Sequence, residues 1–112
     1  MRPMPKPLKF YPVRLAGTRS YADAVGQAVA GDPVTLLREL GNPHDADAIA
    51  VVDGDARTLG YVPRDNWLRG ALVDEGKSAT ASIEAAPDGG VTISVALIDG
   101  EPIGWRDFAP AD

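Results

Sequence analysis

The sequence of 112 residues contains no cysteine and only one histidine. The absence of cysteine excludes disulfides, thiolate nucleophiles and zinc sites built from cysteine. No apolar run approaches the roughly 20 residues that a membrane-spanning helix requires, and the basic, proline-rich residues 1–12 lack the apolar segment of a signal peptide. A chain of this length holds a single core. We therefore expect one soluble, cytoplasmic domain.

Positive charge is scarce and unevenly placed, within a net charge of −5. Residues 1–22 carry five Lys/Arg and no acid, whereas residues 23–112 carry six Lys/Arg and all sixteen Asp/Glu. A protein that coats duplex DNA without preference is usually basic overall. Any contact with nucleic acid therefore has to come from a local cluster of cations.

Short apolar segments separated by glycine and proline predict a mainly β fold of the α+β type. Strands are expected at residues 9–16, 34–40, 48–52, 58–62, 80–86 and 91–98. Turn residues at 53–55 and 87–90 favour hairpins. Many short strands with two short helices indicate a small, partly open β-barrel.

The two helices are expected at residues 21–30 and 65–73. The first has weak helical spacing of apolar residues and is interrupted by Gly26. The second presents Trp67, Leu68, Ala71 and Leu72 on one face, and Gly76 can end it in a left-handed conformation.

Both ends of the chain are expected to lie outside the barrel, which we place at residues 8–104. Prolines at positions 3, 5 and 7 predict that residues 1–7 form a flexible basic arm. Residues 105–112 are expected to form a C-terminal tail, and Trp105 and Phe108 can fold back onto the barrel.

The most informative segment is the turn Asn42-Pro43-His44-Asp45 between two apolar strands, because polar groups gathered in such a turn often serve function. Pro43 holds Asn42 extended, which fixes the direction of the two residues that follow. A lone histidine in a turn is most often solvated. Two roles of Asp45 are compatible. Its carboxylate can accept hydrogen bonds from backbone amides of the turn and also accept a hydrogen bond from a ligand hydroxyl.

The acids and the histidine form no recognisable catalytic or metal-binding pattern. No serine lies in a nucleophile motif. The run from Asp45 to Asp47 begins like a calcium loop, but Ile49 stands where the third oxygen ligand should be. A nuclease requires several carboxylates around metal ions, and the acids here lie mainly in turns. We expect no enzymatic activity, no cofactor and no metal.

Flat side chains near arginines have two readings, which the residues alone leave open. They can form a solvated polar rim, or they can stack on the bases of a single-stranded nucleic acid while the arginines pair with phosphates. The flat side chains are Tyr21, His44 and Tyr61, and the arginines are Arg19, Arg38 and Arg64.

Three motifs resemble the HIRAN domain family over residues 13–98. They are Ala16-Gly17-Thr18-Arg19-Ser20-Tyr21, then Leu37-Arg38-Glu39 with residues 42–49, and Gly60-Tyr61-Val62-Pro63-Arg64 before a helix. The resemblance implies an OB-like, six-stranded β-barrel with two short helices. It also implies a non-enzymatic module that binds single-stranded DNA at free 3′ ends, in DNA repair or replication stress.

The resemblance also implies roles for individual residues. Asp45 would accept the terminal 3′-hydroxyl, and Asn42 would support its turn. Arg19 and Arg64 would hold phosphates, while His44 and Tyr61, with Tyr21 beside them, would contact bases.

Two departures from the family pattern are visible. Ser20 precedes Tyr21 where an aromatic pair is common, and His44 replaces a tyrosine. An imidazole stacks over a smaller area than a phenol ring. The alternative is a protein-interaction or scaffold domain that keeps the barrel without binding DNA ends. A helicase or nuclease is the expected class of protein partner in the DNA-binding reading.

Overall fold

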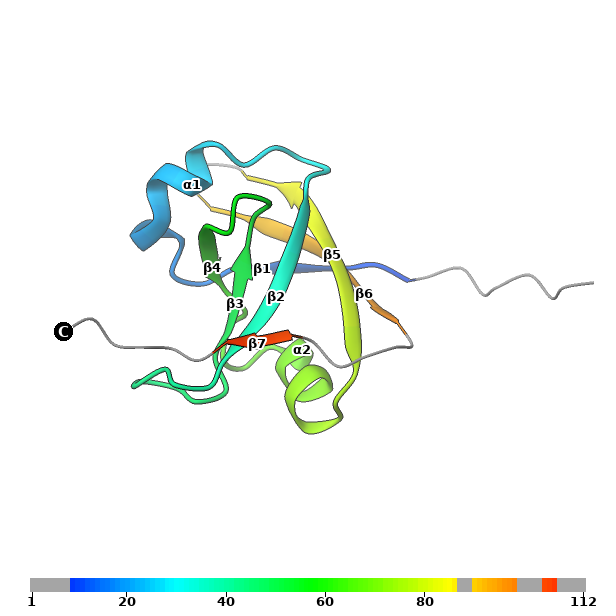
Figure 1. Cartoon of the computed structure of the whole chain (residues 1–112). Helices are drawn as coiled ribbons and strands as arrows, with labels where there is room; N and C mark the ends of the chain where they lie inside the picture. Colours follow the sequence, from blue (N-terminus) through cyan, green and yellow to red (C-terminus); the bar gives the residue numbers. More distant parts are fainter. Residues whose placement is uncertain (1–8, 87–89, 99–103, 107–112) are drawn as a thin grey trace, which may run out of the picture.

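The computed structural model describes residues 9–86 and 90–98, and residues 104–106 by their backbone alone. Within these residues, six strands pair antiparallel in the order β1-β6-β5-β2-β3-β4 and curl into a half-barrel (Figure 1). Their bounds are β1 Tyr11–Arg14, β2 Pro33–Glu39, β3 Ile49–Val52, β4 Thr58–Tyr61, β5 Ser78–Ala85 and β6 Thr92–Ile98. The predicted six-stranded architecture with two short helices is confirmed.

The two ends of this strand order meet at one point. Ala16, just after β1, and Tyr61, at the end of β4, exchange two backbone hydrogen bonds of 2.8 and 2.9 Å. Gly60 makes the approach possible, because a Cβ atom on it would lie 2.8 Å from the carbonyl oxygen of Ala16. These hydrogen bonds join the segment just after β1 to the strand that carries Tyr61.

The core lies inside the curl and explains the strand patterns. All four residues of β3 are buried, because both of its faces are covered. In β2 the inward positions Val34 and Leu36 are buried, and Thr35 between them is exposed. The last residue of β2, Glu39, departs from this alternation and is buried at the edge of the core.

The first helical segment is shorter than the sequence predicts. A 3₁₀ helix, η1 (Thr18–Tyr21), leads into α1 (Ala22–Gly26). The helix predicted to Ala30 ends early because the amide of Gln27 bonds the carbonyl of Ala24, three residues back, at 3.1 Å. Val29, one of the apolar residues with the weak helical spacing, is 59% exposed. In Figure 1, α1 lies at the opposite end of the curl from α2.

The second helix starts two residues later than predicted. Helix α2 (Trp67–Arg69) continues as a π-helical turn, η2 (Gly70–Asp74). Asn66 is its N-cap, since its side chain accepts a 3.0 Å hydrogen bond from the amide of Leu68. The buried face contains Leu68, Ala71 and Leu72, as predicted.

Trp67 does not belong to that buried face. It is 45% exposed and packs edge-on against Tyr11, with ring centroids 5.3 Å apart. Consecutive residues of a helix are offset by about 100°, which places Trp67 at the edge of the buried stripe. Gly76, at φ +65°, reverses the chain after the helical segment.

The backbone of Gly104–Arg106 forms β7, which pairs in parallel with β2. The start of the predicted C-terminal tail therefore extends the sheet beside β2. The predicted arm at residues 1–7, the tail beyond residue 106 and the turn at residues 87–89 lie outside the described residues. No helix in the described part of the chain is long and apolar enough to cross a membrane.

Candidate functional site

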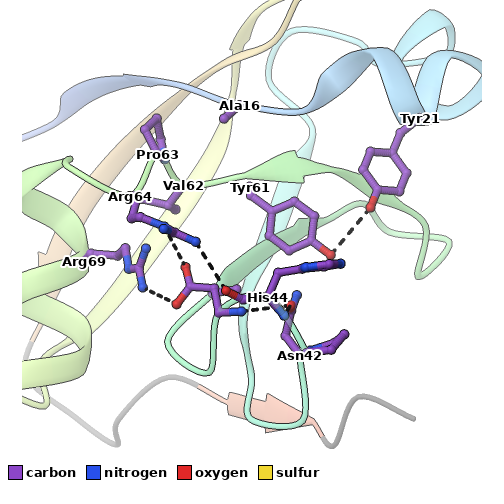
Figure 2. Close-up of a pocket in the computed structure, with 12 residues that line it drawn as sticks. Ala16, Tyr21, Asn42, His44, Tyr61, Val62, Pro63, Arg64 and Arg69 are labelled. Atoms are coloured by element: carbon purple, nitrogen blue, oxygen red, sulfur yellow. Dashed lines mark hydrogen bonds and ion pairs between the residues drawn. The ribbon is translucent and has the colours of Figure 1, made fainter. Parts of the chain in front are cut away.

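A pocket of about 440 Å³ opens where the turn after β2 meets the end of β4 and helix α2. Figure 2 shows the side chains that converge on it from η1, this turn, β4 and α2. The turn contributes residues 42–45, and Tyr61 to Arg64 come from β4 and the segment after it. Tyr21 and Arg69 complete the pocket from opposite sides of the view.

The turn is built by side-chain bonds to its own backbone. The Asn42 Oδ1 accepts hydrogen bonds from the amides of His44, at 2.9 Å, and Asp45, at 3.2 Å. The Asp45 Oδ1 accepts a third bond, of 3.0 Å, from the amide of Asp47. Such Asx turns fix a loop without regular structure. They leave the imidazole of His44 exposed at the mouth of the pocket.

Asp45 lies between two guanidinium groups. Its Oδ1 accepts a 2.7 Å hydrogen bond from Arg69 Nη2, and its Oδ2 lies 3.5 Å from Arg64 Nε. The hydrogen bond from Arg69 is the largest cause that holds the pKa of Asp45 below its usual value, and it outweighs the opposing effect of burial. The backbone bond from Asp47 and the charges of both arginines act in the same direction. Asp45 is therefore ionised at neutral pH.

The two arginines differ in their exposure. The side chain of Arg69 is 13% exposed and that of Asp45 is 20% exposed, so this pair lies mostly out of the solvent. The side chain of Arg64 is 74% exposed, and its Nη2 donates to the carbonyl of His44 at 3.3 Å. Arg64 therefore presents its charge at the rim of the pocket, and Arg69 presents its charge deeper.

A buried carboxylate supports the opposite wall. Glu39, 1% exposed, accepts hydrogen bonds on Oε1 from the Tyr61 hydroxyl, at 2.7 Å, and from Asn42 Nδ2, at 3.3 Å. The Tyr21 hydroxyl donates a long, 3.5 Å bond to the Tyr61 oxygen, and the two rings lie 6.2 Å apart. Burial, followed by the hydrogen bond to Glu39, raises the pKa of Tyr61 well above its usual value. The Tyr61 ring is thus held in one orientation as a protonated phenol.

The structure brings six of the seven predicted site residues to this pocket. They are Tyr21, Asn42, His44, Asp45, Tyr61 and Arg64. Arg19 does not line it, because the short helix η1 directs Arg19 toward two neighbouring hollows. Arg19 therefore lies outside this pocket, and its role at a phosphate stays a prediction. Arg38, also expected near the aromatic side chains, pairs instead with Asp47 at 2.7 Å.

Sequence reasoning missed two residues that organise the pocket, Glu39 and Arg69. Glu39 was part of a recognised motif, but its burial at the end of β2 was not visible in an alternating strand pattern. Arg69 lies 24 residues after its partner Asp45. The available signal was its place in the predicted helix directly after the Tyr61–Arg64 motif.

The pocket combines three chemical features. An ionised carboxylate can accept a hydrogen bond from a hydroxyl group, and an exposed guanidinium can pair with an anion. Flat rings held in a fixed orientation can contact a planar group. Among the described residues, no group of three or more His, Asp or Glu side chains is placed to hold a metal ion. These features define a small β-barrel domain with a pocket at its strand ends that is lined by charged and aromatic side chains.

The sequence assigns this domain to a family. The model of the HIRAN domain matches residues 9–97, and the chain belongs to that family. A search of curated proteins found no significant match.

Solved structures share the fold. A protein from Lactobacillus plantarum aligns with a TM-score of 0.63 at 22% identity, over 81% of this chain and 97% of its own. The HIRAN domain of human HLTF aligns with a TM-score of 0.63 at 20% identity, over 80% and 76%. A structure of that domain in its DNA-bound conformation gives 0.60 at 20% identity, over 80% and 75%. The predicted OB-like HIRAN fold is confirmed.

Proposed function

We propose that this chain is a non-enzymatic module that binds single-stranded DNA and captures free 3′ ends in the pocket around Asp45. Membership of the HIRAN family and the fold shared with the DNA-bound HLTF domain support DNA as the ligand. The proposed setting is DNA repair or replication stress, where a helicase or nuclease would act on the captured end.

The observation that carries the proposal is the position of the Asp45 Oδ2 atom. Within the described residues, Oδ1 accepts two hydrogen bonds, whereas the contact of Oδ2 is the ion pair with Arg64 at 3.5 Å. A carboxylate oxygen has two lone-pair directions. The Oδ2 atom therefore keeps acceptor capacity inside a pocket large enough for a nucleotide, and a terminal hydroxyl is a donor that fits it.

The neighbouring groups suit the remaining parts of a terminal nucleotide. Arg64 at the rim can pair with the phosphate on the 5′ side of the last sugar, because its side chain is exposed. Tyr61 and His44 offer flat surfaces for the base, and base–aromatic stacking contributes about 1–3 kcal/mol per base. Stacking and phosphate pairing tolerate any sequence, so the expected specificity is for the end and not for the bases.

A titration with labelled oligonucleotides tests the proposal. One series compares single strands that end in a 3′-hydroxyl with identical strands that end in a 3′-phosphate, and a second compares single strands with blunt duplexes. We expect the single strand with a free hydroxyl to bind most tightly. Binding of the duplex as tightly as the single strand would contradict the proposal, and absence of any DNA binding would favour a scaffold role for the barrel.

A further inference from the structure

Arg69 lines the pocket but lies outside the three sequence motifs, so the family resemblance assigns it no role. It is the last residue of α2, and the buried side chains of that helical segment are Leu68, Ala71 and Leu72. Asn66 caps the same helix through its 3.0 Å hydrogen bond. The backbone is therefore anchored on both sides of Arg69, which fixes the point from which its guanidinium reaches the pocket.

The hydrogen bond from Arg69 determines how the carboxylate of Asp45 is turned. Arg69 Nη2 donates to Oδ1 at 2.7 Å, and the amide of Asp47 donates to the same oxygen at 3.0 Å. In Figure 2 the guanidinium groups of Arg64 and Arg69 lie at the same wall of the pocket. Because two donors occupy Oδ1, the acceptor capacity of the carboxylate that remains for a ligand lies mainly on Oδ2.

Arg69 is the stronger of the two cations beside Asp45. The Arg69–Asp45 pair lies mostly out of the solvent, whereas the side chain of Arg64 is exposed. Solvent and salt therefore screen the charge of Arg69 less than that of Arg64. The hydrogen bond from Arg69 is also the largest cause of the lowered pKa of Asp45.

Removal of Arg69 would change the pairing of Arg64. Among the described residues, Arg64 is the other cation that forms an ion pair with Asp45, at 3.5 Å. A guanidinium and a carboxylate favour two parallel hydrogen bonds. Without Arg69, Arg64 would therefore take both carboxylate oxygens and occupy the acceptor that a ligand hydroxyl requires.

We propose that Arg69 is a positioning residue that sets the specificity of the pocket for a 3′-hydroxyl. This inference rests on the proposed function. Arg69 binds Oδ1 of Asp45 and so leaves Oδ2 to accept the hydrogen bond from the terminal hydroxyl. It acts through Asp45, without a contact of its own with that hydroxyl.

Three substitutions of Arg69 test its role. Arg69→Met and Arg69→Gln both remove the cation, one with an apolar and one with a polar side chain, so the test does not depend on the folding of a single variant. Arg69→Lys keeps a cation that can donate to Oδ1. Arg57→Met is the matched control, because Arg57 also pairs with an aspartate, Asp53, at 3.0 Å and does not line the pocket. Urea denaturation checks that each variant is folded.

The ligands are two single strands that differ only in the last sugar, which carries a 3′-hydroxyl in one and is 3′-deoxy in the other. The ratio of the two affinities measures the hydroxyl contact alone, because the phosphates and bases are the same. A pH titration of the free protein, followed by NMR of the side-chain carboxyl carbon of Asp45, reports on the contact with Arg69 independently of DNA.

Wild type and Arg57→Met should bind the hydroxyl strand about tenfold more tightly than the 3′-deoxy strand, as expected for one charge-assisted hydrogen bond. Arg69→Met and Arg69→Gln should bind the two strands with nearly equal affinity. Arg69→Lys should restore most of the discrimination. The pKa of Asp45 should rise in the two variants without a cation and stay closer to the wild-type value in Arg69→Lys.

Two outcomes would overturn this inference while end capture stands. The first is discrimination by Arg69→Met and Arg69→Gln equal to that of the wild type. The second is loss of discrimination with an unchanged pKa of Asp45, because Arg69 would then contact the hydroxyl directly. If the wild type itself binds both strands equally, end capture fails, and the inference fails with it.

Discussion

Replacing Asp45 with asparagine removes the negative charge from the pocket and keeps the shape of the side chain. The Oδ1 of asparagine can still accept from Arg69 and from the amide of Asp47, at the 2.7 and 3.0 Å positions of the wild type. The amide nitrogen of asparagine would replace Oδ2, which lies 3.5 Å from Arg64 Nε. Two donors would then face each other, so Arg64 should turn away and the acceptor for a ligand hydroxyl should be lost.

The magnitude for a 3′-hydroxyl strand follows from this geometry. A hydrogen bond to a charged acceptor contributes about 1.5–3 kcal/mol, which corresponds to roughly a ten- to hundredfold loss of affinity on its removal. A strand with a 3′-phosphate should respond in the opposite direction. Its phosphate would meet two arginines without the carboxylate that now neutralises one of them, so it should bind Asp45→Asn more tightly than it binds the wild type.

The assay is a pair of titrations of each protein with strands that differ only at the 3′ group. Wild type should prefer the hydroxyl, and Asp45→Asn should reduce or reverse that preference. Asp47→Asn is the control, since Asp47 pairs with Arg38 and does not line the pocket. Equal affinity of the wild type for the two ends would refute end capture. If Asp45→Asn loses stability but keeps the wild-type preference between the two 3′ groups, the only role of Asp45 is to stabilise its own turn.

The fold supports three further predictions. Leu72→Ala should lower the free energy of unfolding by about 2–5 kcal/mol, measured by urea denaturation, because Leu72 is buried under the sheet; an unchanged stability would place η2 off the core. Gly60→Ala should destabilise by about 1–3 kcal/mol, since its Cβ would press on Ala16, whereas Gly54→Ala, with open space around it, should have little effect. Stability should also fall in acid: the pKa of Asp45 in the folded state lies below its unfolded value of 3.8, so the ionised carboxylate stabilises the fold above that pH, and this contribution is lost as pH falls through the folded pKa. Urea denaturation at neutral and acid pH should show a smaller acid loss for Asp45→Asn than for wild type.

Sequence patterns predicted the features of this domain that depend on neighbouring residues. Strands β2, β3 and β4 and the hairpin between the last two follow from apolar segments and turn residues, which act within a few positions. The turn at Asn42 could also be anticipated, because the ring of Pro43 and the short side chains of the turn act on their own backbone. These local constraints are sufficient to place Asp45 in the turn after β2.

The features that sequence reasoning missed depend on contacts between distant segments. The pairing of Arg69 with Asp45 requires the packing of α2 against the strand ends, which no local pattern specifies. The direction of Arg19 depends on η1 being a 3₁₀ helix, whose tighter turn changes which side chains share a face. Trp67 was misplaced for a related reason, since a short helix packed on one side buries only part of its apolar stripe.

The pocket residues differ in how easily they can be substituted, because some of them form a hydrogen bond with Glu39 and others lie exposed. Asn42 and Tyr61 both depend on this buried carboxylate, so a substitution at either one leaves a polar atom without its partner next to the core. His44 and Arg64, in contrast, lie exposed at the rim of the pocket. Changes of ligand preference during divergence of this domain should therefore accumulate at His44 and Arg64, while Asn42, Tyr61 and Glu39 change only together.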